Sequence, residues 1–338
     1  MDRREPRKQE WRPRGRHFLC YTILIMYQNF IICLQAVLPL FIFILIGMGI
    51  RRARLLNQQE VSHLNQMVFQ VFFPVMLFND LYDQPLRHIV NGRLILFTIV
   101  VVLGIYFLSV LIVTRIEKND RSRGALIQAI YRGNFIIMGM PVVGNIYGYD
   151  HLGVTMMMIS VVIPIYNVLA VITLEIFRGG RIHKSQIFLR ILTNPLILGV
   201  LAGLAANLCG LHLPKMADSI IGEIAGIASP LALIILGASF RFQAVAHMRR
   251  NLSIGLLGKL VVTPGIALTL GMLLGFRDVE FVTLIAIFAA PTAVSSFAMA
   301  ESMGSDAELA GACVVFSSAF AVLTMFLWLF IFKNIGIF

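Results

Sequence analysis

RGNFIIMGMPVVGNIYG, residues 132–148, decides how this chain folds. The stretch is apolar enough to lie in a bilayer, yet it holds an arginine, two asparagines, four glycines and a proline. A proline inside a helix removes a backbone donor and clashes with the carbonyl four residues back, while glycine adopts conformations closed to other residues. We therefore expect a break near Pro141, eased by Gly139. The second half-helix would begin there, with its amides facing the middle of the membrane, where a carboxylate can be received.

The composition places this stretch in a polytopic membrane protein. Of the 338 residues, 58% are hydrophobic and 13% are charged, and apolar runs recur along the whole chain. A spanning helix needs roughly 20 apolar residues, and these runs are too long for the strands of a membrane barrel. The predicted fold class is all-α, with ten transmembrane helices near 27–49, 64–82, 94–114, 125–147, 152–177, 188–209, 217–239, 252–275, 279–302 and 308–333.

The charge distribution indicates the topology. The net charge is +11, and the basic residues concentrate in the loops after predicted helices 1, 3, 5 and 7. The positive-inside rule makes those loops cytoplasmic. The charge is thus a topology signal, and no nucleic-acid partner is expected. Residues 1–17 carry seven more basic side chains on the opposite side, so we interpret residues 1–25 as a basic extension, with Met26 as an alternative start.

Proline spacing indicates an internal repeat. Pro39 and Pro74 are 35 residues apart, as are Pro195 and Pro230, and the two pairs are offset by 156 residues. We predict a first five-helix repeat over residues 26–178, a cytoplasmic linker over 179–190 and a second repeat over 191–338. An odd number of helices inverts the second copy, and inverted repeats with broken helices point to a secondary transporter. Taken singly, prolines such as Pro74 and Pro230 also fit simple helix kinks.

Polar residues near two equivalent breaks form the predicted binding site. Nearly the same offset carries Pro141 onto Ser296, so we expect the helix near 279–302 to break as well. Asn134 lies two helical turns, roughly 10 Å, before Pro141 and can bond a substrate or exposed backbone. The predicted substrate-binding residues are Arg132, Asn134, Gly139, Pro141, Pro291, Thr292, Ser295 and Ser296.

Two basic residues lie inside predicted helices. Arg132 is about 12 Å from the cytoplasmic end of its helix, where a charge should face a partner or a wet cavity, or else extend to the interface. Lys259 lies about two turns from a cytoplasmic loop, so we expect its side chain to extend to the membrane surface.

Acidic residues are the candidates for carrying a coupling proton. They are Asp80 and Asp83 near the outer end of predicted helix 2, Glu175 near the inner end of helix 5, and Glu223 within helix 7. Glu223 is the most deeply placed, although it also fits a simple helix-end residue. With Asn65 and Lys259, it forms the set of coupling and support candidates.

Motifs for other chemistry are missing from the sequence. There is no HExxH or CxxC pattern, and no GxxxxGK[ST] loop for ATP. We therefore expect no enzyme, no metal site and no cofactor, and coupling to an ion gradient.

Several stretches together resemble a known family. They are RGNFIIMGMPVVGNIYG, LNQMVFQVFFPVMLF (64–78), TNPLILGVLAGL (193–204), KLVVTPGIAL (259–268), APTAVSSFAMAESMG (290–304) and AELAGACVVFSS (307–318). From about Met26 to its end, the chain resembles the auxin efflux carrier family, in its bacterial branch of malate or malonate permeases.

The resemblance implies an architecture and a mechanism. Helices 1, 2, 6 and 7 would form a scaffold, often a homodimer, and the other six a moving domain in which helices 4 and 9 cross. The substrate carboxylate would bind Asn134 and the backbone near Pro141, and transport would be elevator-like. The chain departs from the plant carriers at Ser296, where they have proline, and at Arg132, which looks like bacterial members. Arg132 places a further fixed positive charge near the site, and this suits a dicarboxylate, which carries two negative charges.

The predicted function is secondary active transport of small organic anions, mono- or dicarboxylates such as malate or malonate, driven by protons across a bacterial inner membrane. One alternative is sodium coupling on the same fold, with oxygen ligands from Asn134, Thr292, Ser295 and Ser296. Another is a membrane sensor that binds its ligand without moving it, although no long loop or soluble domain offers an output.

Overall fold

The computed structural model describes residues 16–82, 91–178 and 184–338, and in these ranges the chain forms helices and no strand. The all-α prediction is confirmed for them. The first fifteen residues of the predicted extension, Asp83, and residues 179–183 of the predicted linker lie outside the described ranges. The helices are α1 (Arg16–Arg52), α2 (Gln58–Met67), η1 (Val68–Phe72), α3 (Phe73–Tyr82), α4 (Gly92–Ile116), α5 (Asp120–Tyr131), α6 (Phe135–Tyr147), η2 (Tyr149–His151), α7 (Gly153–Ile176), α8 (Lys184–Leu192), α9 (Pro195–Leu208), α10 (Lys215–Ser239), α11 (Phe242–Leu257), η3 (Gly258–Val262), α12 (Thr263–Leu273), α13 (Asp278–Phe288), α14 (Ser295–Ser302) and α15 (Ala307–Asn334).

Six helical segments in the described part are long and apolar enough to cross a membrane. They are Gln58–Tyr82, Gly92–Ile116, Gly153–Ile176, Lys215–Ser239, Phe242–Leu273 and Ala307–Asn334. Each coincides with a predicted span. The other four predicted spans fall on α1, on α9, and on the pairs α5–α6 and α13–α14, in which the helix is interrupted. The chain is therefore an all-helical, multi-pass membrane protein.

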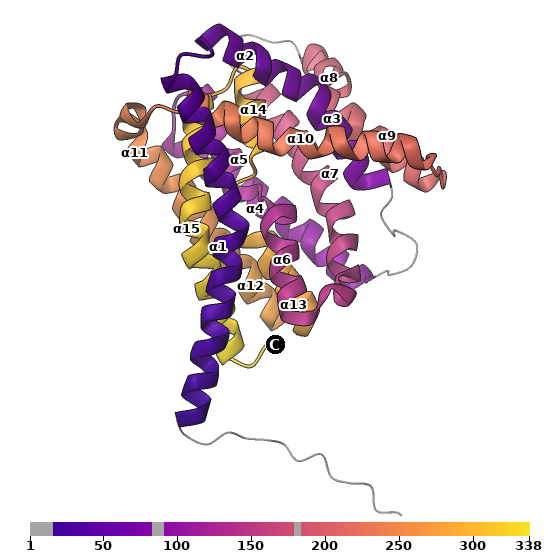
Figure 1. Cartoon of the computed structure of the whole chain (residues 1–338), viewed down its shortest axis with the longest axis vertical. Helices are drawn as coiled ribbons and strands as arrows, with labels where there is room; N and C mark the ends of the chain where they lie inside the picture. The colour runs from indigo at the N-terminus through magenta and orange to yellow at the C-terminus, as the bar shows by residue number, and fades with distance from the viewer. Residues whose placement is uncertain (1–15, 83–90, 179–183) are drawn as a thin grey trace, which may run out of the picture.

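By their contacts, the helices can be divided into two groups. Figure 1 shows α1 running beside α15, which is one of the places where the groups meet. In the first group, α1 packs against α10, and α3 packs against α9 and α10. In the second, α6 packs on α13, α4 on α5, and α11 and α14 on α15. The groups meet where α1 contacts α15 and α6, and where α3 contacts α7. The scaffold and moving domain that the resemblance implies stay a prediction, as does the inverted repeat.

Glycine sets the distance between α1 and α10. A Cβ atom on Gly47 would lie 1.9 Å from the carbonyl oxygen of Ile234, and one on Gly237 would lie 2.1 Å from that of Ile44. Side chains at either position would push the two backbones apart. The first helix group is thus held together by direct backbone contact.

Two spans widen into a π turn just before a proline. η1 ends two residues before Pro74, and η3 ends two residues before Pro264. A proline cannot donate to the carbonyl four residues back, so the helix loosens there. At Pro264 the freed carbonyl of Leu260 accepts a bond from the indole Nε1 of Trp328 at 3.0 Å. Both prolines lie within continuous helical segments, which agrees with the kink interpretation.

The break predicted at Pro141 is wrong in position. Helix α6 begins at Phe135 and continues through Pro141, and the interruption falls at residues 132–134. Gly139 serves packing rather than a break, because a Cβ there would lie 2.9 Å from the Cβ of Ala286 on α13. The second predicted break is found between Phe288 and Ser295.

Candidate functional site

The two interruptions pair with each other. The backbone N–H of Asn134 donates to the carbonyl of Pro291 at 2.7 Å, and Gly133 and Thr292 form an isolated antiparallel bridge. Thr292 is fixed further, because its hydroxyl donates to the carbonyl of Ala129 at 3.0 Å. Extended backbone inside a membrane protein is stable only when its polar groups are bonded, and this crossing supplies those bonds. The interruption between α5 and α6 and the one between α13 and α14 therefore lie against each other.

Gly133 lets the two chains approach. A Cβ atom at this position would lie 2.9 Å from the carbonyl oxygen of Ile287 and 3.1 Å from Nζ of Lys259. Any larger residue would therefore have to displace either backbone or the lysine head group. The glycine that the interruption requires is therefore Gly133, whereas Gly139 lies within α6.

Lys259 lies behind the crossing. Its side chain is 0% exposed, and its Nζ has no hydrogen-bond partner among the residues that the structure describes. The expectation that Lys259 extends to the membrane surface is wrong. The amine instead lies beside Gly133.

Arg132 is held within the crossing. It is 3% exposed, which excludes extension to the interface. Its guanidinium donates to Oδ1 of Asn167 at 2.6 Å and to Oγ of Ser295 at 2.8 Å, with further contacts to Gln128 and Met299. All four partners are neutral. In the described ranges, no carboxylate oxygen lies within 4.0 Å of the Arg132 guanidinium, which is the distance limit for an ion pair. No described carboxylate therefore compensates its positive charge by direct contact.

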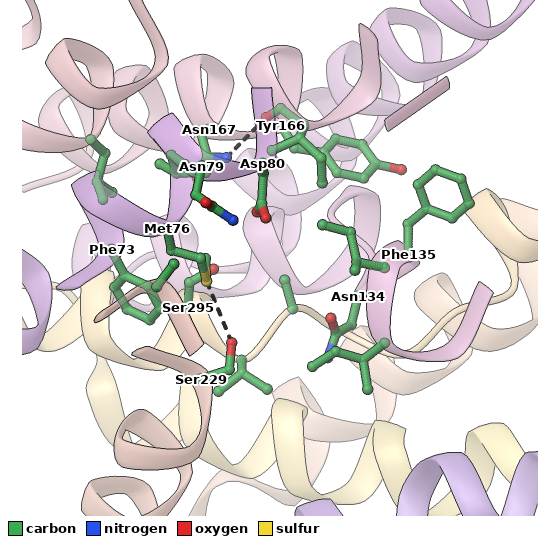
Figure 2. Close-up of a pocket in the computed structure, with 18 of the residues that line it drawn as sticks. Phe73, Met76, Asn79, Asp80, Asn134, Phe135, Tyr166, Asn167, Ser229 and Ser295 are labelled. Carbon is green, nitrogen blue, oxygen red and sulfur yellow. Dashed lines mark hydrogen bonds between the residues drawn. The ribbon is translucent and has the colours of Figure 1, made fainter. Parts of the chain in front are cut away.

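A cavity of about 320 Å³ opens on one side of the crossing (Figure 2). It lies between α3, α9 and α10 of the first helix group and α7 and the crossing of the second. Its size is that of a small-molecule site. Its wall is mostly apolar and is formed by Phe73, Met76, Leu77, Asn79, Asp80, Arg132, Gly133, Asn134, Phe135, Ile136, Ile137, Ile163, Tyr166, Asn167, Leu196, Gly222, Ala225, Gly226, Ser229, Ala293, Val294 and Ser295.

Asn134 offers this cavity a free polar group. It is the N-cap residue of α6, but its side chain makes no cap bond, and its Nδ2 has no partner within the described residues. Phe135, Ile136 and Ile137, the first turn of α6, line the cavity beside it. The first amides of a helix have no partner within that helix, so this turn presents donors and a positive dipole end.

The structure divides the predicted binding residues into three sets. Arg132, Asn134 and Ser295 line the cavity. Pro291 and Thr292 build the crossing behind it. Gly139, Pro141 and Ser296 are absent from the cavity wall, and the Ser296 side chain is buried within α14.

The coupling and support candidates lie in different places. Asn65 is buried and donates from Nδ2 to the carbonyl of Ala298 at 3.1 Å and to Ser302 at 3.0 Å, tying α2 to α14. Glu223 is exposed on α10 and is not part of the cavity wall. Its predicted role as a proton carrier gains no geometric support.

The structure adds residues that the sequence reasoning missed or ranked low. Asn167 and Tyr166 come from α7, and Ser229 comes from α10. Asp80, which the sequence offered as one of several acidic residues, points into the cavity from α3 (Figure 2). A polar residue in a long apolar helix was the available signal, but it does not say which face the residue occupies.

An all-helical membrane protein whose interrupted helices cross beside an internal cavity is a membrane transporter. The comparison with known families agrees. The chain belongs to the family described as membrane transport protein, which it matches over residues 32–329. It is therefore a transporter and not an enzyme. The resemblance to the auxin efflux carriers is confirmed at the level of the family.

Two archaeal relatives cover nearly the whole chain. An uncharacterized transporter of Methanothermobacter thermautotrophicus is 24% identical over 304 residues, which are 87% of this chain and 96% of the relative. An uncharacterized transporter of Methanocaldococcus jannaschii is 22% identical over 316 residues, or 89% and 99% of the two chains. Neither description names a substrate.

Proposed function

We propose that the protein is a secondary active transporter of small organic anions, mono- or dicarboxylates such as malate or malonate, and that the cavity at the crossing is its substrate site. The observation that carries the proposal is Arg132. Its guanidinium is buried, is held by neutral side chains and lacks a described carboxylate partner. A buried charge without a partner is costly, and an anionic substrate would compensate it.

The surrounding groups complete a carboxylate site. Asn134 and the first turn of α6 line the same cavity as Arg132, and Nδ2 of Asn134 has no partner among the described residues. Ser295, at the start of α14, brings a second helix N-terminus to the cavity. Helix N-termini and side-chain donors together favour anions, and the largely apolar wall suits the rest of a small organic molecule.

The packing supports an elevator-like movement. The cavity lies between the two helix groups, and five of its eight polar residues belong to the second group. A substrate held there would move with the second group along the face formed by α3, α9 and α10. Such a sliding of one helix group past another gives alternating access around one site.

Proton coupling suits this site better than sodium coupling. Two of the predicted sodium ligands are already engaged, since the hydroxyl of Thr292 donates to Ala129 and Oγ of Ser295 accepts from Arg132. A guanidinium at 2.8 Å from Ser295 would repel a sodium ion. Lys259 brings a second basic group to the crossing from behind.

The test is uptake by proteoliposomes. Labelled malate, malonate, lactate and indole acetate are offered with an imposed proton gradient and then with a sodium gradient. Protein-free vesicles correct for permeation of the undissociated acids. We expect carboxylates to accumulate in the vesicles, and this accumulation should be lost when the proton gradient is collapsed. It should not depend on the sodium gradient. Uptake driven by the sodium gradient would show that sodium, and not the proton, is the coupling ion. Binding of these anions without uptake would favour a sensor.

A further inference from the structure

A carboxylate faces the cavity from the side opposite the crossing. Asp80 lies on α3, two residues before its end, and Figure 2 shows its carboxyl oxygens directed into the cavity. In the described part of the chain it takes part in no hydrogen bond and no ion pair. Its neighbours in the wall are largely apolar, among them Phe73, Met76 and Leu77.

The elements packed against α3 bring few other charges to this side. Helix α9 contains no titratable residue. On α10, Asp218 accepts a bond from the hydroxyl of Tyr82, and Lys215 and Glu223 are exposed and are not part of the wall. On α7, Tyr166 lines the cavity, with a buried hydroxyl that has no described partner. From the crossing, Arg132 lines the same cavity as Asp80.

Of the described residues that line the cavity, Asp80 and Arg132 are the two that carry formal charges. The empty cavity is then neutral, with one charge on each side. A carboxylate substrate that binds Arg132 would make it negative if Asp80 stayed ionised. Two like charges enclosed in one small apolar cavity repel each other strongly. Protonation of one of them removes this repulsion at the lowest cost in free energy.

We propose that Asp80 takes up one proton when a carboxylate substrate binds, so that the site binds anion and proton together. The carboxylate of Asp80 accepts the proton from water that enters the open cavity, and the resulting hydroxyl can then donate to the substrate. When the substrate leaves, the proton returns to water. Loaded with a monoanion, the cavity is again neutral. The proposal rests on the function proposed above and names the residue through which pH controls that site.

The test is the pH dependence of substrate affinity. Purified full-length protein in proteoliposomes exchanges labelled lactate, or malonate if lactate is not taken up, and the half-saturating concentration is measured from about pH 5 to about pH 8. For the wild type we expect the half-saturating concentration to rise about tenfold per pH unit once Asp80 is ionised in the empty site. In Asp80→Asn the half-saturating concentration should stay low and should not change with pH. In Asp80→Glu it should rise with pH as it does in the wild type.

The control is Glu223→Gln, which removes another of the acidic candidates, one that is not part of the cavity wall, and should leave the slope unchanged. Melting temperatures and gel-filtration profiles confirm that the variants are folded. A flat wild-type profile, or a slope that survives in Asp80→Asn, would overturn the proton role while carboxylate transport stands. Loss of exchange in folded Asp80→Asn would make Asp80 a binding group and would also overturn the role. If the wild type takes up no carboxylate, the proposed function fails, and this inference fails with it.

Discussion

The backbone N–H of Asn134 donates to the carbonyl of Pro291 over 2.7 Å, so one short bond joins two helix breaks from opposite halves of the chain. The bond involves the backbone of Asn134 and leaves its side chain unengaged at the cavity. The structural and the functional contributions of this residue are therefore separable. A change of side chain should alter the site while the crossing stays formed.

Asn134→Ala should abolish carboxylate transport and leave the fold intact. The substitution removes a side-chain donor that has no described protein partner, so few intramolecular bonds are lost. Uptake by proteoliposomes and the melting temperature in detergent measure the two effects.

The matched control is Asn145→Ala on the same helix. Asn145 is exposed, and its Nδ2 donates to the carbonyl of Pro141 away from the cavity wall. It should transport at nearly the wild-type rate. Unchanged uptake by Asn134→Ala would remove Asn134 from the binding site.

Arg132 should determine which anions are preferred. Arg132→Ala removes the fixed charge and should shift preference from malonate toward lactate. Arg132→Lys keeps a charge but lacks the planar fork that reaches Asn167 and Ser295 together, so it should keep the preference at a reduced rate. Both variants leave buried polar partners unpaired, and we expect a loss of stability of about 3 kcal/mol for Arg132→Ala. The ratio of malonate to lactate uptake is the measurement, and an equal ratio in wild type and Arg132→Ala would contradict the prediction.

The sequence predicts the spans well because their signal is local. Apolar runs of spanning length and loop charges identify the helices without any knowledge of packing. The position of the break at Arg132 to Asn134 could not be found in this way. Pro141 is the stronger local signal, but the helix accommodates it, whereas Gly133 is needed because of the carbonyl of Ile287 from a distant segment.

The site shows the same limit. Arg132 and Asn134 were predicted because a polar residue in an apolar span is conspicuous. Asp80 and Glu223 were equally conspicuous, yet one faces the cavity and the other is exposed. Which face of a helix a residue occupies depends on tertiary packing, and that information is not local.

Lys259→Met should leave the melting temperature equal to or above that of the wild type. The amine is fully buried with no described hydrogen-bond partner, and methionine has a similar length without the cost of burying a polar head. Lys333→Met, at the exposed end of α15, is the control and should change stability by less than about 0.5 kcal/mol. A clear drop for Lys259→Met would mean that the amine is bonded in the native protein. Transport by the same variant then reports whether the positive charge at the crossing is needed.

Gly47→Ala should destabilise the protein, whereas Gly49→Ala should not. The two glycines lie on the same helix, two residues apart, and differ in what a methyl group would meet. At Gly47 it would lie 1.9 Å from the carbonyl oxygen of Ile234, so α1 and α10 must separate, at a cost of about 3 kcal/mol. At Gly49 nothing lies within 4 Å, and alanine should add helix stability of about 0.5 kcal/mol. Thermal unfolding of both variants in one detergent measures the difference, and equal melting temperatures would show that the close packing of α1 on α10 does not hold in the protein.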